Sequence, residues 1–158
     1  ISIGATVLVG YEVGAKRYND ARTYSWLSVG TAIFISFFSS CILFFFREQI
    51  ATLYTADETV IQLTIQFFVF AALFQLSDAI QAPVQGSLRG YKDVNVTFIM
   101  AIISYWVIGL PVGYLLSKYT DFGPFGYWIG LIVGLTVGAI TLSARLIRIQ
   151  RKKQDTVQ

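Results

Sequence analysis

The sequence predicts an all-α protein that crosses a membrane several times. Of its 158 residues, 55% are hydrophobic and 16% are aromatic, and the hydrophobic residues gather in long runs separated by charged segments. An apolar run of about 20 residues forms a helix that spans a hydrocarbon core of about 30 Å. We therefore expect a polytopic membrane protein with four complete transmembrane helices and the end of a fifth.

The expected helices follow one another along the chain with short connections. The first apolar stretch, within residues 1–11, is too short for a complete span, and the sequence does not begin with Met. This stretch also lacks the basic start and the cleavage site of a signal peptide. The four complete spans cover residues 24–46, 60–85, 96–116 and 124–144. We expect the chain to be the C-terminal piece of a longer protein, starting inside a membrane helix.

Basic residues divide unequally between alternate connecting segments. Ten of the twelve lie in the first connection, the third connection and the tail 145–158, whereas only Arg47 and Lys118 lie in the second and fourth connections. Because basic residues near span ends stay on the cytoplasmic side, the tail is predicted to be cytoplasmic. The basic tail then acts as a topology signal, so the lipid bilayer is an expected partner and nucleic acid is not.

The last span carries four glycines at intervals of four residues: Gly126, Gly130, Gly134 and Gly138. Residues four apart lie on one helix face, and small residues on such a face let another membrane helix approach closely. This pattern predicts a helix-packing face rather than a chemical site.

Two prolines predict irregular helix geometry. In the span 96–116, Pro111 lies between Gly109 and Gly113, where its ring removes a backbone donor and clashes with the preceding turn. We expect a kink at Pro111. Pro83 is expected to free the carbonyl of Ala79 and to kink the span 60–85 in the same way.

Asp78 is the one acidic side chain inside a long apolar run. A charged side chain at the centre of a bilayer costs at least about 2.5–3.5 kcal/mol, so its presence there indicates function. The alternative interpretation is a protonated Asp78 that only hydrogen-bonds a neighbouring helix.

At about 100° per residue, Gln81, Gln85 and Phe74 fall on the same face as Asp78. This face is interpreted as the wall of a polar cavity. The two glutamines could instead simply hydrogen-bond neighbouring helices.

The residue inventory excludes several enzyme classes. The sequence contains no His, which excludes a Ser-His pair and the H-E-x-x-H zinc motif. A single buried Asp cannot form an aspartic dyad, and no G-x-x-x-x-G-K-[ST] phosphate loop occurs. We therefore expect no enzymatic activity and no cofactor.

Five segments occur together in a characteristic order. They are VGYEVGAK (9–16), REQIATLYT (47–55), QAPVQGSLRGYKD (81–93), YWVIGLP (105–111) and GYWIG (126–130). In combination they resemble the multidrug and toxic compound extrusion (MATE) family, particularly its NorM-type branch. The resemblance covers essentially the whole chain.

This resemblance implies a twelve-helix antiporter of two six-helix lobes, which expels cationic drugs and dyes in exchange for Na⁺ or H⁺. It also implies a location in a bacterial cell (inner) membrane. The chain would be part of the C-terminal lobe, from the end of the eighth span through the twelfth, with the missing N-terminal lobe as its partner. The family pattern places an Asp that binds the coupling cation at Asp78, which becomes the Na⁺ site if sodium drives transport. Phe74, Gln81 and Gln85 become candidates for the cavity lining.

At Phe74 the family often has Tyr, so this chain lacks a hydroxyl but keeps an aromatic face for a cation. Two other functions explain the sequence less well than efflux does. A lipid-linked polysaccharide flippase of the same superfamily would be expected to carry basic residues inside its spans. A non-transporting membrane scaffold held by glycine packing gives no reason for Asp78 beside Gln81 and Gln85.

Overall fold

The computed structural model describes residues 1–155, and their regular structure is entirely helical. The elements are α1 (Ser2–Gly14), α2 (Tyr18–Phe45), α3 (Arg47–Tyr54), α4 (Glu58–Gly90), α5 (Val94–Ile102), the π-helix η1 (Ile103–Gly109), α6 (Leu110–Tyr119) and α7 (Phe125–Asp155). With α5, η1 and α6 taken as one continuous helix, 4 helices are long and apolar enough to cross a membrane. The predicted fold class is confirmed.

The observed helices extend beyond the apolar runs. The helix expected from residue 24 begins at Tyr18, and the one expected to end at residue 85 continues to Gly90. The basic tail is helical as far as Asp155, and its last part, 156–158, lies outside the described residues. Hydropathy marks only the part of a helix that suits hydrocarbon, and so it misses turns that continue into the polar boundary.

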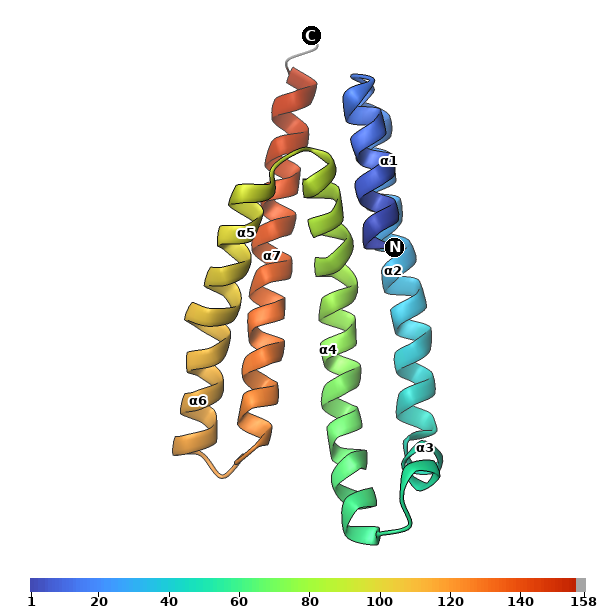
Figure 1. Cartoon of the computed structure of the whole chain (residues 1–158), viewed down its shortest axis with the longest axis vertical. Coiled ribbons are helices and arrows are strands. Elements are labelled where there is room, and N and C mark those ends of the chain that lie inside the picture. The colour runs from blue at the N-terminus through green and yellow to red at the C-terminus, as the bar shows by residue number, and fades with distance from the viewer. Residues whose placement is uncertain (156–158) are drawn as a thin grey trace.

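The α4 and α7 helices run in the same direction through the middle of the bundle (Figure 1). The segment α5–η1–α6 packs against α7, whereas α1 and α2 pack against α4. The α1–α2 turn, the α4–α5 turn and the C-terminal part of α7 lie at one end. The other end holds α3 and the α6–α7 loop (Figure 1). This arrangement agrees with the predicted division of the connections into two sides.

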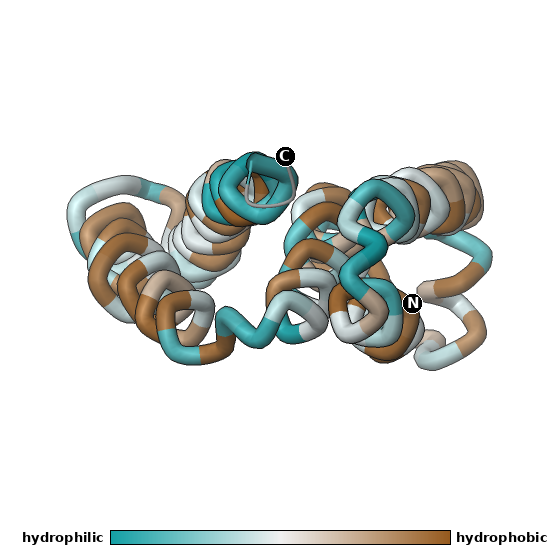
Figure 2. Tube along the Cα trace, turned by 90° about the horizontal axis from the view of Figure 1, so that it is seen from above, coloured by the Kyte–Doolittle hydropathy of each residue, from teal (hydrophilic) through white to brown (hydrophobic). Residues whose placement is uncertain are grey.

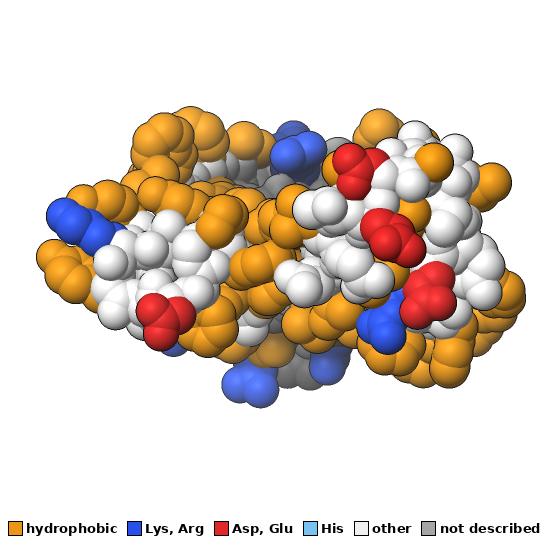
Figure 3. Space-filling model, turned by 90° about the horizontal axis from the view of Figure 1, so that it is seen from below, with side chains coloured by type: hydrophobic (Ala, Val, Ile, Leu, Met, Phe, Trp, Pro, Cys, Tyr) orange, Lys and Arg blue, Asp and Glu red, His pale blue; other side chains and the backbone are white. Residues whose placement is uncertain are grey.

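The two ends of the bundle differ in charge. Seen from above, hydrophilic residues gather in the connections and at the end of α7 (Figure 2). Seen from below, acidic side chains are visible on the opposite end (Figure 3). The segments at that lower end carry Arg47, Glu48, Asp57, Glu58, Lys118 and Asp121. The basic residues therefore concentrate at one end, which is the charge asymmetry on which the predicted cytoplasmic side rests.

One continuous seam on α4 faces α7. Its members recur three and four residues apart, which is the spacing of side-by-side parallel helices. They are Phe67, Phe70, Phe74, Ser77, Gln81, Val84 and Leu88. Aromatic rings from both helices meet toward the α3 end, and Ser77 lies 3.3 Å from the hydroxyl of Thr136. At the basic end, Val84 and Leu88 share a buried cluster with leucines of α7.

Glycine contacts join α7 to α6 and η1. A Cβ atom on Gly130 would lie 2.5 Å from the carbonyl oxygen of Gly109 and 2.5 Å from the Cα of Gly113. A Cβ atom on Gly134 would lie 3.2 Å from the Cα of Gly109. The two backbones therefore touch, and this is the packing that the glycine spacing predicts.

Hydroxyl groups attach α1 and α2 to the backbone of α4. Four Ser or Thr side chains donate to its carbonyl oxygens: Ser2 to Ala82 at 2.7 Å, Thr6 to Gly86 at 3.0 Å, Ser36 to Gln75 at 2.9 Å and Ser40 to Ala72 at 3.4 Å. Such bonds hold membrane helices together where lipid gives no hydrophobic driving force.

The α1–α2 and α4–α5 turns share one conformation. Lys16 and Lys92 adopt positive φ angles of 60° and 63°. The next residue in each turn, Arg17 or Asp93, donates its N–H to a carbonyl five residues earlier, at 2.9 and 3.0 Å. These bonds close the helix ends in the manner of a Schellman motif. Arg17 also donates to Glu12 at 2.5 Å, and this bond raises the pKa of the guanidinium.

The two prolines are accommodated differently. The π-helix η1 ends just before Pro111, and the N–H of Leu110 bonds to the carbonyl of Tyr105, five residues back. Irregular backbone is therefore present at the predicted place, although the change precedes the proline. In contrast, α4 continues through the buried Pro83 without interruption, so the kink expected there stays a prediction.

Gly130→Ala in the full-length parent is expected to destabilise the protein by about 1–3 kcal/mol, because the added methyl group overlaps the backbone of α6. Gly30→Ala in α2 is the matched control, since a Cβ atom at Gly30 meets nothing within 4 Å. Thermal unfolding in detergent should show a lower melting temperature only for Gly130→Ala. Equal melting temperatures would contradict the close α6–α7 contact.

Candidate functional site

The predicted polar face of α4 is divided between two environments. Asp78 is exposed on the surface of the bundle, and Phe74 and Gln85 are half-buried. Gln81, one turn after Asp78, is only 1% exposed and lies in the interface with α7 and η1. The acid is therefore available from outside the described helices, whereas the neighbouring amide is enclosed by them.

Gln81 is held by groups from two other helices. The hydroxyl of Tyr105 in η1 donates to Gln81 Oε1 at 3.0 Å. Gln81 Nε2 lies 2.7 Å from the position that a Cβ atom on Gly138 would occupy. Among the described residues, this buried Nε2 atom has no hydrogen-bond partner. Gln81 therefore bonds a neighbouring helix, and its amide nitrogen still has donors available.

The four glycines of α7 do not face a single partner helix. Gly126, Gly130 and Gly134 meet α6 and η1, but Gly138 faces Gln81 on α4. Four residues rotate a helix by about 400°, so each step along the row advances by about 40°. Three steps bring the last glycine about 120° around α7, onto a different neighbour. The expectation that all four glycines form one packing face for a single helix is therefore wrong for Gly138, which makes room for a polar side chain.

Tyr105, which bonds Gln81, is a residue that we did not predict from the sequence as part of the site. The available signal was its place within the apolar span 96–116, because a tyrosine hydroxyl in such surroundings usually finds a partner. The π-helical geometry of η1 could not be read from the sequence. As a result, the helix that supplies the partner of Gln81 becomes apparent only in the fold.

Phe74 belongs to the aromatic part of the seam. Its ring packs edge-on against Trp128, with centroids 6.5 Å apart and planes at 80°. Toward the α3 end, Phe70 stacks on Phe125 at 5.4 Å. An aromatic surface therefore borders the turn of α4 that carries Asp78.

Asp78 is not part of a metal cluster within residues 1–155. No group of three or more His, Cys, Asp or Glu side chains in this part of the chain is placed to hold a metal ion. Any cation bound at Asp78 would thus be held by fewer than three such side chains from the described helices.

The fold and the four membrane-length helices define a polytopic α-helical membrane protein. Residues 1–115 match the family model described as MatE, and the chain belongs to this family. The family resemblance drawn from the five segments is thereby confirmed.

Two curated relatives are both named "Probable multidrug resistance protein NorM". The one from Bacillus licheniformis is 56% identical over 152 residues, which are 96% of this chain and 34% of the relative. The one from Oceanobacillus iheyensis is 55% identical over the same shares of both chains. The chain thus spans about a third of the length of the curated relatives it matches.

A solved structure has the same fold. It is described as the inward-facing conformation of a multidrug resistance MATE family transporter, and it superposes with a TM-score of 0.89 at 19% identity. The match covers 99% of this chain and 36% of that one. The solved structure is described as a transporter and the curated relatives as multidrug resistance proteins, which agrees with the expectation of no enzymatic activity drawn from the residue inventory.

Tyr105→Phe in the full-length parent should lower the free energy of unfolding by about 1–3 kcal/mol, because the buried Gln81 oxygen loses its donor. Tyr114→Phe is the control, since the Tyr114 hydroxyl bonds Lys118 at an exposed site. Melting temperatures of the two purified variants provide the comparison. A Tyr105→Phe variant as stable as the control would show that the bond to Gln81 contributes little.

Proposed function

We propose that the full-length parent of this chain exports organic cations by secondary active antiport, with Asp78 as the site of the coupling cation, Na⁺ or H⁺. The relatives at 56% and 55% identity carry multidrug resistance names, and these names support an efflux function for the parent. The single observation that carries the assignment of the site is an acidic side chain within a membrane-length helix. Such residues are rare and mark ion or substrate pathways.

The environment of Asp78 suits reversible binding of a cation. The carboxylate is not enclosed by the described helices, and it lies one turn after Phe74 and one turn before the enclosed amide of Gln81. A proton and Na⁺ then compete for the same oxygens, so either ion can serve as the coupling ion. Organic cations are attracted by the aromatic face and the negative charge.

The exposure of Asp78 also suggests where the rest of the parent lies. Because this chain spans about a third of its relatives, the N-terminal lobe is available to cover the Asp78 face of α4. The drug-binding cavity would then form between that lobe and α4, with Phe74 and Gln85 on its wall. Additional ligands for the cation would come from the same missing part.

Coupling requires two arrangements of the transporter that bind the ion and the drug with different affinities. The α4 helix is suited to link these arrangements, because it contacts α1, α2, α3, α5 and α7. Occupation of Asp78 favours one arrangement, and drug binding favours the other. Pro83, five residues after Asp78, provides a place where α4 can bend between them.

Asp78→Asn in the full-length parent should abolish drug efflux against a gradient while leaving membrane insertion unchanged, because the amide keeps the shape but loses the charge. Asp78→Glu should retain part of the activity. Glu58→Gln in the first turn of α4 removes an acid outside the proposed site and serves as the control. Dye efflux under separately imposed Na⁺ and pH gradients measures the effect. Unchanged ion dependence in an Asp78→Asn variant expressed at the parental level would leave Asp78 with a structural role only.

The membrane orientation can be tested separately. We expect Tyr18, Lys92 and the part of the tail after Arg148 to be cytoplasmic, because basic residues concentrate at their end of the bundle. After replacement of Cys41, single cysteines at these positions should resist a membrane-impermeant reagent applied outside the cell. A cysteine at Asp57 should react. The opposite labelling pattern would reverse the proposed topology.

A further inference from the structure

A small cavity lies at the basic end of the bundle, between the α4–α5 turn and α7. Its volume is about 260 Å³, and its lining combines two stretches of the chain that are far apart in the sequence. The lining residues are Tyr91, Lys92, Asp93, Arg145, Ile149, Lys152 and Lys153. The proposed transport cycle does not use any of them.

The charges around this cavity are strongly unbalanced, with four basic side chains and one acidic side chain. The acid, Asp93, is engaged by Arg145, whose Nε and Nη2 atoms donate to it at 2.8 and 3.2 Å. This two-point contact fixes the plane of the guanidinium, and the Arg145 side chain remains 35% exposed. Burial raises the pKa of Tyr91, so its phenol stays neutral and adds no negative charge.

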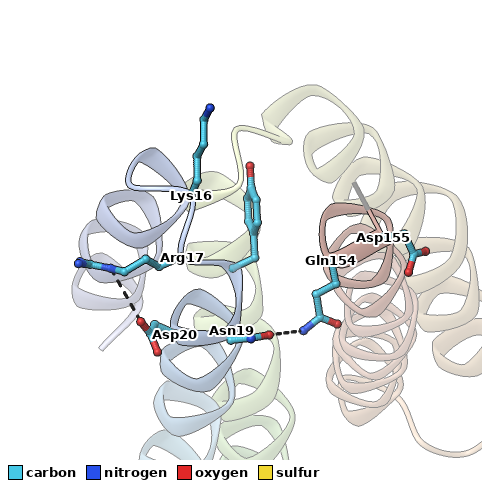
Figure 4. Close-up of a pocket in the computed structure, with 7 residues that line it drawn as sticks. Lys16, Arg17, Asn19, Asp20, Gln154 and Asp155 are labelled. Atoms are coloured by element: carbon cyan, nitrogen blue, oxygen red, sulfur yellow. Dashed lines mark hydrogen bonds and ion pairs between the residues drawn. The ribbon is translucent and has the colours of Figure 1, made fainter. Parts of the chain in front are cut away.

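A larger neighbouring cavity provides a contrast. It measures about 650 Å³ and is lined by the residues drawn in Figure 4. Its two basic residues, Lys16 and Arg17, are balanced by Asp20 and Asp155, and Gln154 bonds across it to Asn19 at 2.8 Å. Proximity to the basic end therefore does not by itself produce an excess of positive charge. The excess is a property of the smaller cavity.

Exposed apolar residues follow the cavity residues along α5. Val94 follows Asp93 directly and is 51% exposed, and Phe98 and Ile102 repeat at intervals of four residues along α5 with exposures of 64% and 40%. Three exposed apolar residues on one face of a membrane-length helix suit contact with an acyl chain. A headgroup in the cavity would thus have its hydrocarbon portion beside α5.

We propose that this cavity binds the phosphate of an anionic phospholipid, with Lys92, Arg145, Lys152 and Lys153 around the headgroup and an acyl chain along α5. Basic pockets between membrane helices are suited to anionic headgroups. The adjoining apolar stripe distinguishes a lipid from a soluble phosphate, because a free ion makes no use of it. The small volume suits a phosphodiester rather than a bulky drug.

Binding is tested on the full-length parent, purified in detergent and titrated with phosphatidylglycerol or phosphatidylcholine, with retained lipid counted by native mass spectrometry. The double variant Lys92→Gln/Lys152→Gln should weaken phosphatidylglycerol binding by about tenfold or more, since each basic residue contributes to attraction. Arg148→Gln/Arg151→Gln is the matched control, because it removes two charges from the same end but none from this cavity. The control should change binding by less than about twofold.

Lys92→Arg/Lys152→Arg, which keeps both charges, should preserve binding. Only variants whose melting temperatures equal that of the parent are compared. If the double Gln variant unfolds, Lys92→Gln alone, at an exposed turn residue, replaces it. Equal losses in the cavity and control variants would reduce the effect to general surface attraction and overturn the proposal. Unchanged binding in the cavity variant would also overturn it. So would inorganic phosphate that binds as tightly as the lipid and displaces it.

Discussion

The parallel contact between α4 and α7 is the constraint on which the rest of the bundle depends. Every other helix that the structure describes contacts one of these two. Since lipid is as apolar as leucine, association must come from close packing and hydrogen bonds. The contacts follow this requirement: backbone meets backbone at Gly130, and hydroxyl groups from α1 and α2 reach carbonyl oxygens of α4. The α4 helix is thereby held on several sides, while its Asp78 face remains exposed.

Much of this fold could be predicted from the sequence, because crossing a membrane leaves a strong pattern in both length and charge. The spans and the sidedness of their connections follow from apolar runs and from where basic residues fall. The ends of the helices could not be predicted in this way, since Tyr18 and Asp155 belong to polar turns that hydropathy does not register. The short helix α3 was missed for the same reason, because it lies in a connection that was expected to be a loop.

The candidate site was predictable only in part. Asp78 could be identified from the sequence, because the free-energy cost of placing a carboxylate in hydrocarbon depends only on where that residue lies within an apolar run. The surroundings of Gln81 depend on which helices pack together, so neither Tyr105 nor the role of Gly138 could be derived from periodicity alone. The glycine row illustrates this limit, since its spacing predicts close packing correctly but drifts around α7 onto a second neighbour.

The continuous helical form of α7 has a mechanical consequence. Its 31 residues extend about 46 Å at 1.5 Å per residue, well beyond a hydrocarbon core of about 30 Å. The projecting part is therefore a rigid lever rather than a loose tail. A tilt of α7 within the bilayer rotates the whole helix. Lys152 and Lys153 lie far from the pivot, so they are displaced more than residues within the bilayer. Movements of the lobe that are small at the level of Gly130 thus become large at the membrane surface.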